Sequence, residues 1–153
     1  MLRTLHRAKE RGAALVEFAL ISPFLFLILF GIIDFGWMFT QVIDTRHGTR
    51  EAARLAAVNY QPTADVGLTQ TDLIVAEVCA RLEDPTVSRV TLTVDGTDRS
   101  TGGTATVRVE RDLEQLTGFF APMLDGNTPS SEVKFRLERT ITWDDTSGQQ
   151  ACP

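Results

Sequence analysis

The sequence predicts an α+β protein in which a long N-terminal transmembrane helix extends into a small domain with a second helix and a three-stranded antiparallel sheet. Three observations predict this fold. An apolar run near the N-terminus is long enough to cross a membrane, a later segment repeats apolar residues at helical spacing, and the C-terminal half alternates apolar with polar residues. The 153 residues suit one modest domain plus an additional element.

The apolar run covers residues 13–33. As a helix it would be about 31 Å long, which matches the hydrocarbon thickness of a bilayer. A buried core helix is one alternative, but such a helix should have a polar face, and residues 24–33 have none. A secretory signal peptide is another, but the bulky residues after the run offer no small-x-small cleavage site. We therefore expect a membrane-spanning helix over residues 13–35, which Pro23 should kink or locally melt because it cannot donate a backbone hydrogen bond.

Charge is distributed unevenly along the chain. Residues 1–12 hold four basic residues and one acidic residue, whereas the remainder holds 11 basic and 19 acidic residues. Because positive residues stay on the cytoplasmic side, we expect residues 1–12 to be a cytoplasmic leader. The helix should then make a single pass through a bacterial cytoplasmic (inner) membrane, with the C-terminal domain outside. The acidic remainder argues against nucleic acid as a partner.

Glu17 is the most informative polar residue of the run. A carboxylate costs about 2.5–3.5 kcal/mol at the bilayer centre and less near its edge. If the bond after Gly12 is cut, the new α-amino group of Ala13 lies one helical turn before Glu17. Glu17 then falls in the first turn, where the helix dipole favours an anion. A snorkelling or simply tolerated carboxylate is the alternative.

The sequence around this junction resembles a known family. A basic leader, a glycine and an apolar run with glutamate at its fifth position are similar to the class III signal of type IV pilin precursors, which a membrane-embedded prepilin peptidase cuts after the glycine. Residues 12–39 are more specifically similar to the start of TadE-like proteins of tight-adherence (Flp) pilus systems. The matching positions are Gly12, Ala13, residues 16–19 (Val-Glu-Phe-Ala), Pro23 and Asp34.

The resemblance implies a structural role. The helix would first anchor the protein and later serve as an assembly surface, where Glu17 pairs with the Ala13 amine of a neighbouring subunit. The implied partners are membrane lipid, a prepilin peptidase, other pilin-like subunits and the pilus assembly machinery, and no cofactor is implied. Ala13 replaces the bulky residue usual in type IV pilins, and the chain is far longer than a major Flp pilin. Both points favour a minor pilin or pseudopilin, located in the membrane and at the cell surface or pilus.

Beyond the membrane, we expect residues 36–60 to extend the helix, because residues 39–58 contain no proline and several alanines. One face should be an arginine stripe, and the alanine face should pack against the domain. Close approach of a neighbouring helix to the alanine face is the alternative. Residues 60–62 (Tyr-Gln-Pro) should end the helix. The stripe consists of Arg46, Arg50 and Arg54, and the alanines are Ala52, Ala53, Ala56 and Ala57.

The remaining residues, 61–153, should form the outer domain. We expect a second helix over residues 70–83, with Thr69 and Asp72 as a capping box and Cys79 on its apolar face. Two cysteines in an exported segment favour a disulfide between Cys79 and Cys152, which would also fix the polar tail. Two free thiols are the alternative.

Alternation with a period of two predicts three antiparallel strands, over residues 90–94, 105–109 and a long third stretch, 133–143. Between the last two strands lies an apolar excursion centred on Phe119 and Phe120. We expect these rings to fill the core, and an exposed adhesive or docking patch is the alternative.

The sequence contains none of the common catalytic motifs, such as HExxH, CxxC, GxSxG or a glycine-rich phosphate loop, and its acidic turns lack the ligands of a calcium loop. We therefore expect neither enzymatic activity nor a bound metal. The rival to the pilin-like interpretation is an uncleaved single-pass membrane protein with an extracytoplasmic ligand-binding or sensor domain. In that protein the leader would remain and Glu17 would be incidental.

Overall fold

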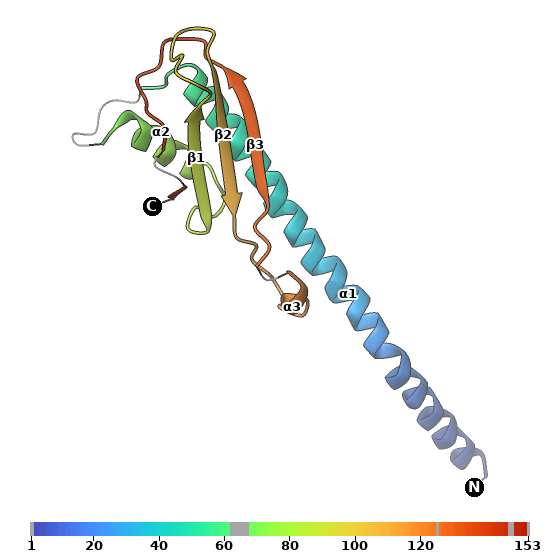
Figure 1. Cartoon of the computed structure of the whole chain (residues 1–153). Helices are drawn as coiled ribbons and strands as arrows, with labels where there is room; N and C mark the ends of the chain where they lie inside the picture. The colour runs from blue at the N-terminus through green and yellow to red at the C-terminus, as the bar shows by residue number, and fades with distance from the viewer. Residues whose placement is uncertain (1, 62–67, 125, 147–148, 153) are drawn as a thin grey trace.

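The computed structural model describes residues 2–61, 68–124, 126–146 and 149–152, and of residues 2–11 it describes the backbone alone. One long helix carries the outer domain at its C-terminal end (Figure 1). The elements in chain order are α1 (Leu2–Ala57), α2 (Gln70–Cys79), β1 (Ser88–Val94), β2 (Thr104–Arg111), α3 (Ala121–Leu124), β3 (Ser130–Arg136) and β4 (Gln150–Ala151).

Helix α1 confirms the predicted extension beyond the apolar run. Its 56 residues make a rod of about 84 Å. The helix ends because Asn59 adopts a positive φ of 53°, and the Tyr60 N–H then donates to the Leu55 carbonyl oxygen (3.0 Å). Of the three residues expected to end it, Pro62 lies outside the described residues. The arginine stripe (Arg46, Arg50 and Arg54) is exposed and the four alanines are buried, as expected.

Helix α2 begins as predicted and ends earlier than predicted. The Thr69 hydroxyl accepts from the Asp72 N–H, and the Asp72 carboxylate accepts from the Thr69 N–H, so both halves of the capping box are present. The expected end at Glu83 is wrong. The helix stops at Cys79 because the following N–H groups, from Arg81 onward, bond three residues back rather than four, which tightens the chain into a turn.

The sheet has four antiparallel strands in the order β3-β2-β1-β4, rather than the three predicted. The additional strand, β4, pairs with Arg89 and Val90 on the free edge of β1. The long third strand is also a correction, because β3 stops at Arg136. Beyond it the Leu137 N–H donates to Gly103 and the Ile141 N–H donates to Arg99, so the chain leaves β2 and follows the β1–β2 loop.

The core lies between one face of the sheet and the two helices. Strand β1 alternates buried and half-buried residues along its whole length, as the period of two predicts. Trp143 is fully buried, and its Nε1–H donates to the Ala56 carbonyl oxygen (3.1 Å), which ties the C-terminal segment to α1. Helix α1 passes behind β2 and β3, while α2 lies beside β1 (Figure 1). Only the C-terminal half of α1 is covered by this core.

Phe119 and Phe120 do not fill the core, so that expectation is wrong. Phe119 is 54% exposed and Phe120 is half-buried, and both rings contact α1. The β2–β3 connection leaves the sheet at Arg111 and runs along α1 toward its N-terminus, with α3 below the sheet in Figure 1. The strand direction carries these apolar residues away from the core.

Candidate functional site

The predicted cleavage point, between Gly12 and Ala13, lies in an exposed part of α1. Apart from the backbone of α1 itself, no described atom lies within 4 Å of the position that a Cβ on Gly12 would take, and Ala13 is exposed. The backbone is helical on both sides of the bond. An alanine at position 12 would therefore fit this helix without displacing any described atom.

Glu17 is exposed on the same part of α1. Among the described side chains, none forms a hydrogen bond or an ion pair with its carboxylate. Residues four apart share one helix face, so Ala13 and Glu17 lie on the same side of α1. In the uncut chain the Ala13 nitrogen is an amide without charge, so among the described side chains this face offers a carboxylate and no matching cation.

Pro23 lies inside α1, which continues through it without interruption. The helix therefore does not melt there, although proline removes the N–H that would bond the Ala19 carbonyl oxygen. The Ser22 hydroxyl donates to that same oxygen (3.4 Å). The freed carbonyl thus has a partner within its own helix, which matters where no water is present.

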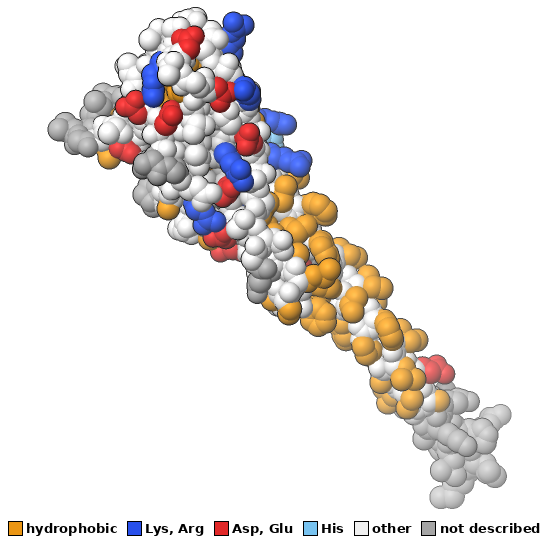
Figure 2. All heavy atoms as spheres, viewed as in Figure 1, with side chains coloured by type: hydrophobic (Ala, Val, Ile, Leu, Met, Phe, Trp, Pro, Cys, Tyr) orange, Lys and Arg blue, Asp and Glu red, His pale blue; other side chains and the backbone are white. Residues whose placement is uncertain are grey.

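The N-terminal half of α1 has an apolar and uncovered surface. An 18-residue window within 12–57 has a mean hydropathy of 2.5, and none of that window is buried. Figure 2 shows apolar side chains around the lower rod, while charged side chains gather over the outer domain. A helix with this length and exposure fits a membrane anchor. Its most exposed large side chains are Phe24, Leu15, Leu20, Ile32 and Ile21.

At the C-terminal end of this surface, Asp34 is buried beneath the β2–β3 connection. It is 2% exposed, and its carboxylate accepts from the Thr117 N–H (2.9 Å) and from the Thr117 hydroxyl (2.6 Å). Burying a carboxylate among apolar side chains costs free energy unless the carboxylate is hydrogen-bonded. Thr117 supplies those bonds from a segment 83 residues away in the sequence.

Two further pairs lie along the same side of α1. The Gln41 side chain donates to the Glu114 carbonyl oxygen (2.7 Å) and accepts from the Glu114 N–H (2.9 Å). Asp44 forms an ion pair with Arg111 (3.2 Å), whose side chain is 2% exposed. We call the pairs Asp34–Thr117, Gln41–Glu114 and Asp44–Arg111 the polar ladder. The polar ladder holds the chain that follows β2 against α1.

Comparison with known proteins places the family signal on the helix. Residues 12–54 match the model of the family described as TadE-like protein. Residues 12–54 are thus similar to TadE-like proteins, and we call them the TadE-like region. The match confirms the resemblance inferred from the sequence. No curated protein and no solved structure matches the chain.

The TadE-like region begins at Gly12 and ends at Arg54, close to the end of α1 at Ala57. It therefore contains the predicted cleavage point, the apolar surface and the helix half of the polar ladder. Residues 1–11 and the whole sheet lie outside it. With the exposed apolar helix, the TadE-like region fits a membrane-anchored, pilus-associated protein.

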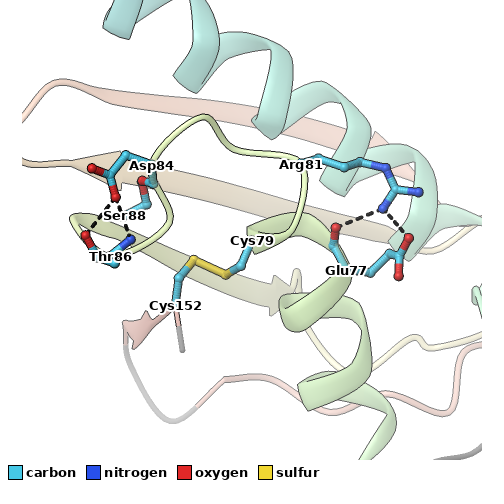
Figure 3. Close-up of a disulfide and its surroundings, with 7 residues drawn as sticks. All are labelled: Glu77, Cys79, Arg81, Asp84, Thr86, Ser88 and Cys152. Carbon is cyan, nitrogen blue, oxygen red and sulfur yellow. Dashed lines mark hydrogen bonds and ion pairs between the residues drawn. A yellow bond between two sulfur atoms is a disulfide. The ribbon is translucent and has the colours of Figure 1, made fainter.

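The disulfide between Cys79 and Cys152 is present, with the two Cα atoms 5.5 Å apart. It joins the end of α2 to the residue after β4 (Figure 3). The Cys152 N–H also donates to the Ser88 carbonyl oxygen (3.1 Å). The described part of the polar tail is thus held against β1, whereas residues 147, 148 and 153 lie outside the described residues.

Sequence reasoning finds the exposed N-terminal residues of this site and misses the ladder. By sequence alone, Asp34 is only the acidic residue that closes the apolar run. The available signal is a polar row at positions 34, 41, 45 and 49, whose spacings of seven, four and four keep one helix face. All four side chains are buried: Asp34, Gln41, Thr45 and Thr49.

Proposed function

We propose that this chain is a minor pilin or pseudopilin of a tight-adherence (Flp, type IV-like) pilus, anchored in the inner membrane and assembled through α1 after prepilin peptidase cuts between Gly12 and Ala13. The observation that carries the proposal is the TadE-like region, which begins at Gly12 and includes an 18-residue apolar window of α1 that the described part of the chain leaves unburied. The role is structural and not catalytic, and such a filament serves adherence, secretion or DNA uptake.

The exposed apolar surface of α1 can contact two partners in turn, first lipid and then other subunits. In the membrane, lipid covers the apolar side chains of residues 13–33. In a filament, the same side chains pack against other pilin-like subunits with the help of the assembly machinery. Cleavage links the two states, because it removes the basic leader and gives Ala13 a positive charge one turn from Glu17.

The deciding experiment is the intact mass of the protein extracted from membranes that contain a prepilin peptidase. We expect the wild-type protein to begin at Ala13 and Gly12→Ala to retain residues 1–12. Gly36→Ala is a matched control, since Gly36 is also a helical glycine of α1 with nothing within 4 Å of the position that a Cβ would take, and it should be processed normally. A wild-type protein that keeps its leader would favour an uncleaved anchor that carries a ligand-binding or sensor domain.

A further inference from the structure

The β2–β3 connection contains an uncharged apolar turn that lies next to α1. Residues 115–124 contain no Asp, Glu, Lys or Arg. Leu116, Phe119 and Met123 are 61%, 54% and 71% exposed. Among the described residues outside α1, Leu68 (51%) is the only other exposed large hydrophobic side chain. We call residues 116–124 the apolar foot.

The apolar foot lies at the outer end of the apolar run. The ring centroids of Phe119 and Phe30 are 5.6 Å apart, and those of Phe120 and Phe35 are 5.7 Å apart. If the midpoint of residues 13–33 lies at the bilayer midplane, Phe30 lies about 10 Å from it, within a hydrocarbon half-thickness of about 15 Å. Phe119 then lies at nearly the same depth as Phe30.

The backbone of the foot suits this depth, because many of its N–H groups have partners. Thr117 donates to Asp34, and the Phe119 N–H donates to the Thr117 hydroxyl (3.3 Å). Within α3, Met123 and Leu124 both donate to the Phe120 carbonyl oxygen (2.9 and 3.0 Å). Each backbone polar group without a partner costs several kcal/mol in hydrocarbon, so these hydrogen bonds and the packing of the foot on α1 lower the cost of placing the turn at this depth.

We propose that the apolar foot inserts into the outer leaflet of the membrane beside α1, so that the chain contacts lipid at a second place. The proposal rests on the anchoring of α1 in a membrane. Lipid is the favoured occupant because the foot continues the apolar surface of α1. Before assembly, a second protein is a poorer fit, because three exposed side chains fall far short of the roughly 800 Å² per partner that a stable interface buries.

The test uses tryptophan emission from the full chain in vesicles that contain brominated phospholipids, which quench nearby indoles. Trp37→Phe removes the tryptophan nearest the membrane, and the fully buried Trp143 stays as a constant background. In this background, Phe119→Trp reports on the foot. Met123→Trp is a second reporter in case the first variant misfolds. Thr101→Trp, an exposed position in the β1–β2 loop, is the matched control.

We expect Phe119→Trp to lose emission in brominated vesicles, more with bromine near the headgroup end of the acyl chain than near its middle, and Thr101→Trp to lose none. Phe26→Trp, on the apolar surface of α1, tests the anchor itself and should be quenched most by the deeper bromine. Quenching at Phe26→Trp without quenching at either foot reporter would overturn the foot and leave the anchor standing. Absence of quenching at Phe26→Trp would overturn both. Foot emission that changes with protein-to-lipid ratio and not with bromine would assign the foot to a second copy and also overturn the proposal.

Discussion

The carboxylate of Asp34 accepts two hydrogen bonds from Thr117, one from the backbone N–H and one from the hydroxyl. This pair joins the outer end of the apolar helix to a turn 83 residues later in the chain. The hydrogen bonds from Thr117 replace the water that an exposed Asp34 carboxylate would bind. In return, the carboxylate accepts the backbone N–H of the turn. Each residue therefore makes the position of the other tolerable near the membrane.

The first prediction concerns this pair. Asp34→Ala should free the Thr117 amide, and loss of hydrogen bonds to a charged group, at roughly 1.5–3 kcal/mol, should speed its hydrogen exchange by about 10- to 100-fold. Asp98→Ala is the matched control, because Asp98 accepts the same pair of bonds from Ser100 (2.9 and 2.6 Å) within a local turn. Exchange at Thr117 that stays at the wild-type rate in Asp34→Ala would remove the pair's role in holding the turn.

A second prediction concerns the buried ion pair of the ladder. Asp44→Ala removes the carboxylate that forms an ion pair with the Arg111 guanidinium, which is 2% exposed, and should lower the free energy of unfolding by about 3–5 kcal/mol. The measurement is urea unfolding of the full chain in detergent, followed by circular dichroism.

Two further variants serve as controls for this measurement. Asp95→Ala breaks an ion pair whose Lys134 partner is 66% exposed, and it should change stability little. The double variant Asp44→Leu with Arg111→Met should recover much of the loss, because it leaves no unpaired charge behind. A double variant as unstable as Asp44→Ala alone would indicate that packing, and not charge, holds this contact.

The disulfide gives the third prediction. Cys79 and Cys152 are 73 positions apart, and closing such a loop contributes about 4 kcal/mol by the chain-entropy estimate. The variant with both cysteines changed to serine should unfold at correspondingly lower urea concentration, reported by the emission of the buried Trp143. Wild-type protein treated with a reductant should behave in the same way. Equal midpoints for oxidised and reduced wild-type protein would show that the bond adds no stability.

The elements that the sequence predicted well are those with local causes. The start of α2 follows from Thr69 and Asp72, which are three residues apart and bond each other. The end of β3 was predicted poorly because Leu137, Ile141 and Trp143 keep the phase of the apolar pattern and are buried, although residues 138–140 are exposed and the N–H groups of Leu137 and Ile141 donate to the β1–β2 loop. Beyond Arg136 the apolar pattern continues although pairing with β2 has ended, and the sequence reveals the pattern but not the pairing.

The ladder and the foot could not be predicted from local pattern because their partners are distant in the sequence. Phe119 and Phe120 are apolar whether they fill the core or lie beside the helix. The choice depends on the direction in which β2 ends, which the fold sets. Strand β4 has only two residues, too few for any period, and it forms where the tail is already tethered by Cys152.

The fourth prediction concerns pH. The Arg89 guanidinium bonds Asp112 with two hydrogen bonds (2.9 and 2.5 Å) and lowers the pKa of that carboxyl, and the Thr69 hydroxyl likewise lowers the pKa of Asp72. A lowered folded-state pKa stabilises the fold at pH values above the ordinary carboxyl pKa of about 3.9. That stabilisation is lost as the pH falls through the folded-state value.

Urea midpoints of the full chain in detergent should therefore be constant from neutral pH down to about pH 5 and fall below about pH 4. Asp112→Asn should flatten part of that fall, because the residue no longer binds a proton on unfolding. A midpoint that rises on acidification would contradict the sign of both pKa shifts.

The last prediction separates processing from assembly at Glu17. Its carboxylate is exposed about 6 Å along the helix axis from Ala13 and has no partner among the described side chains, so it does not hold this subunit's fold together. Glu17→Ala should therefore be cleaved after Gly12 like the wild type, as intact mass would report. It should nevertheless be recovered in sheared filaments far less often, because a neighbour's free amine then has no anion to pair with in an apolar interior.

Leu20→Ala removes a comparable exposed side chain without changing charge and should assemble more nearly like the wild type. Filament yields of Glu17→Ala equal to those of Leu20→Ala would show that the charge has no part in assembly, whereas restoration by Glu17→Asp would support the ion pair.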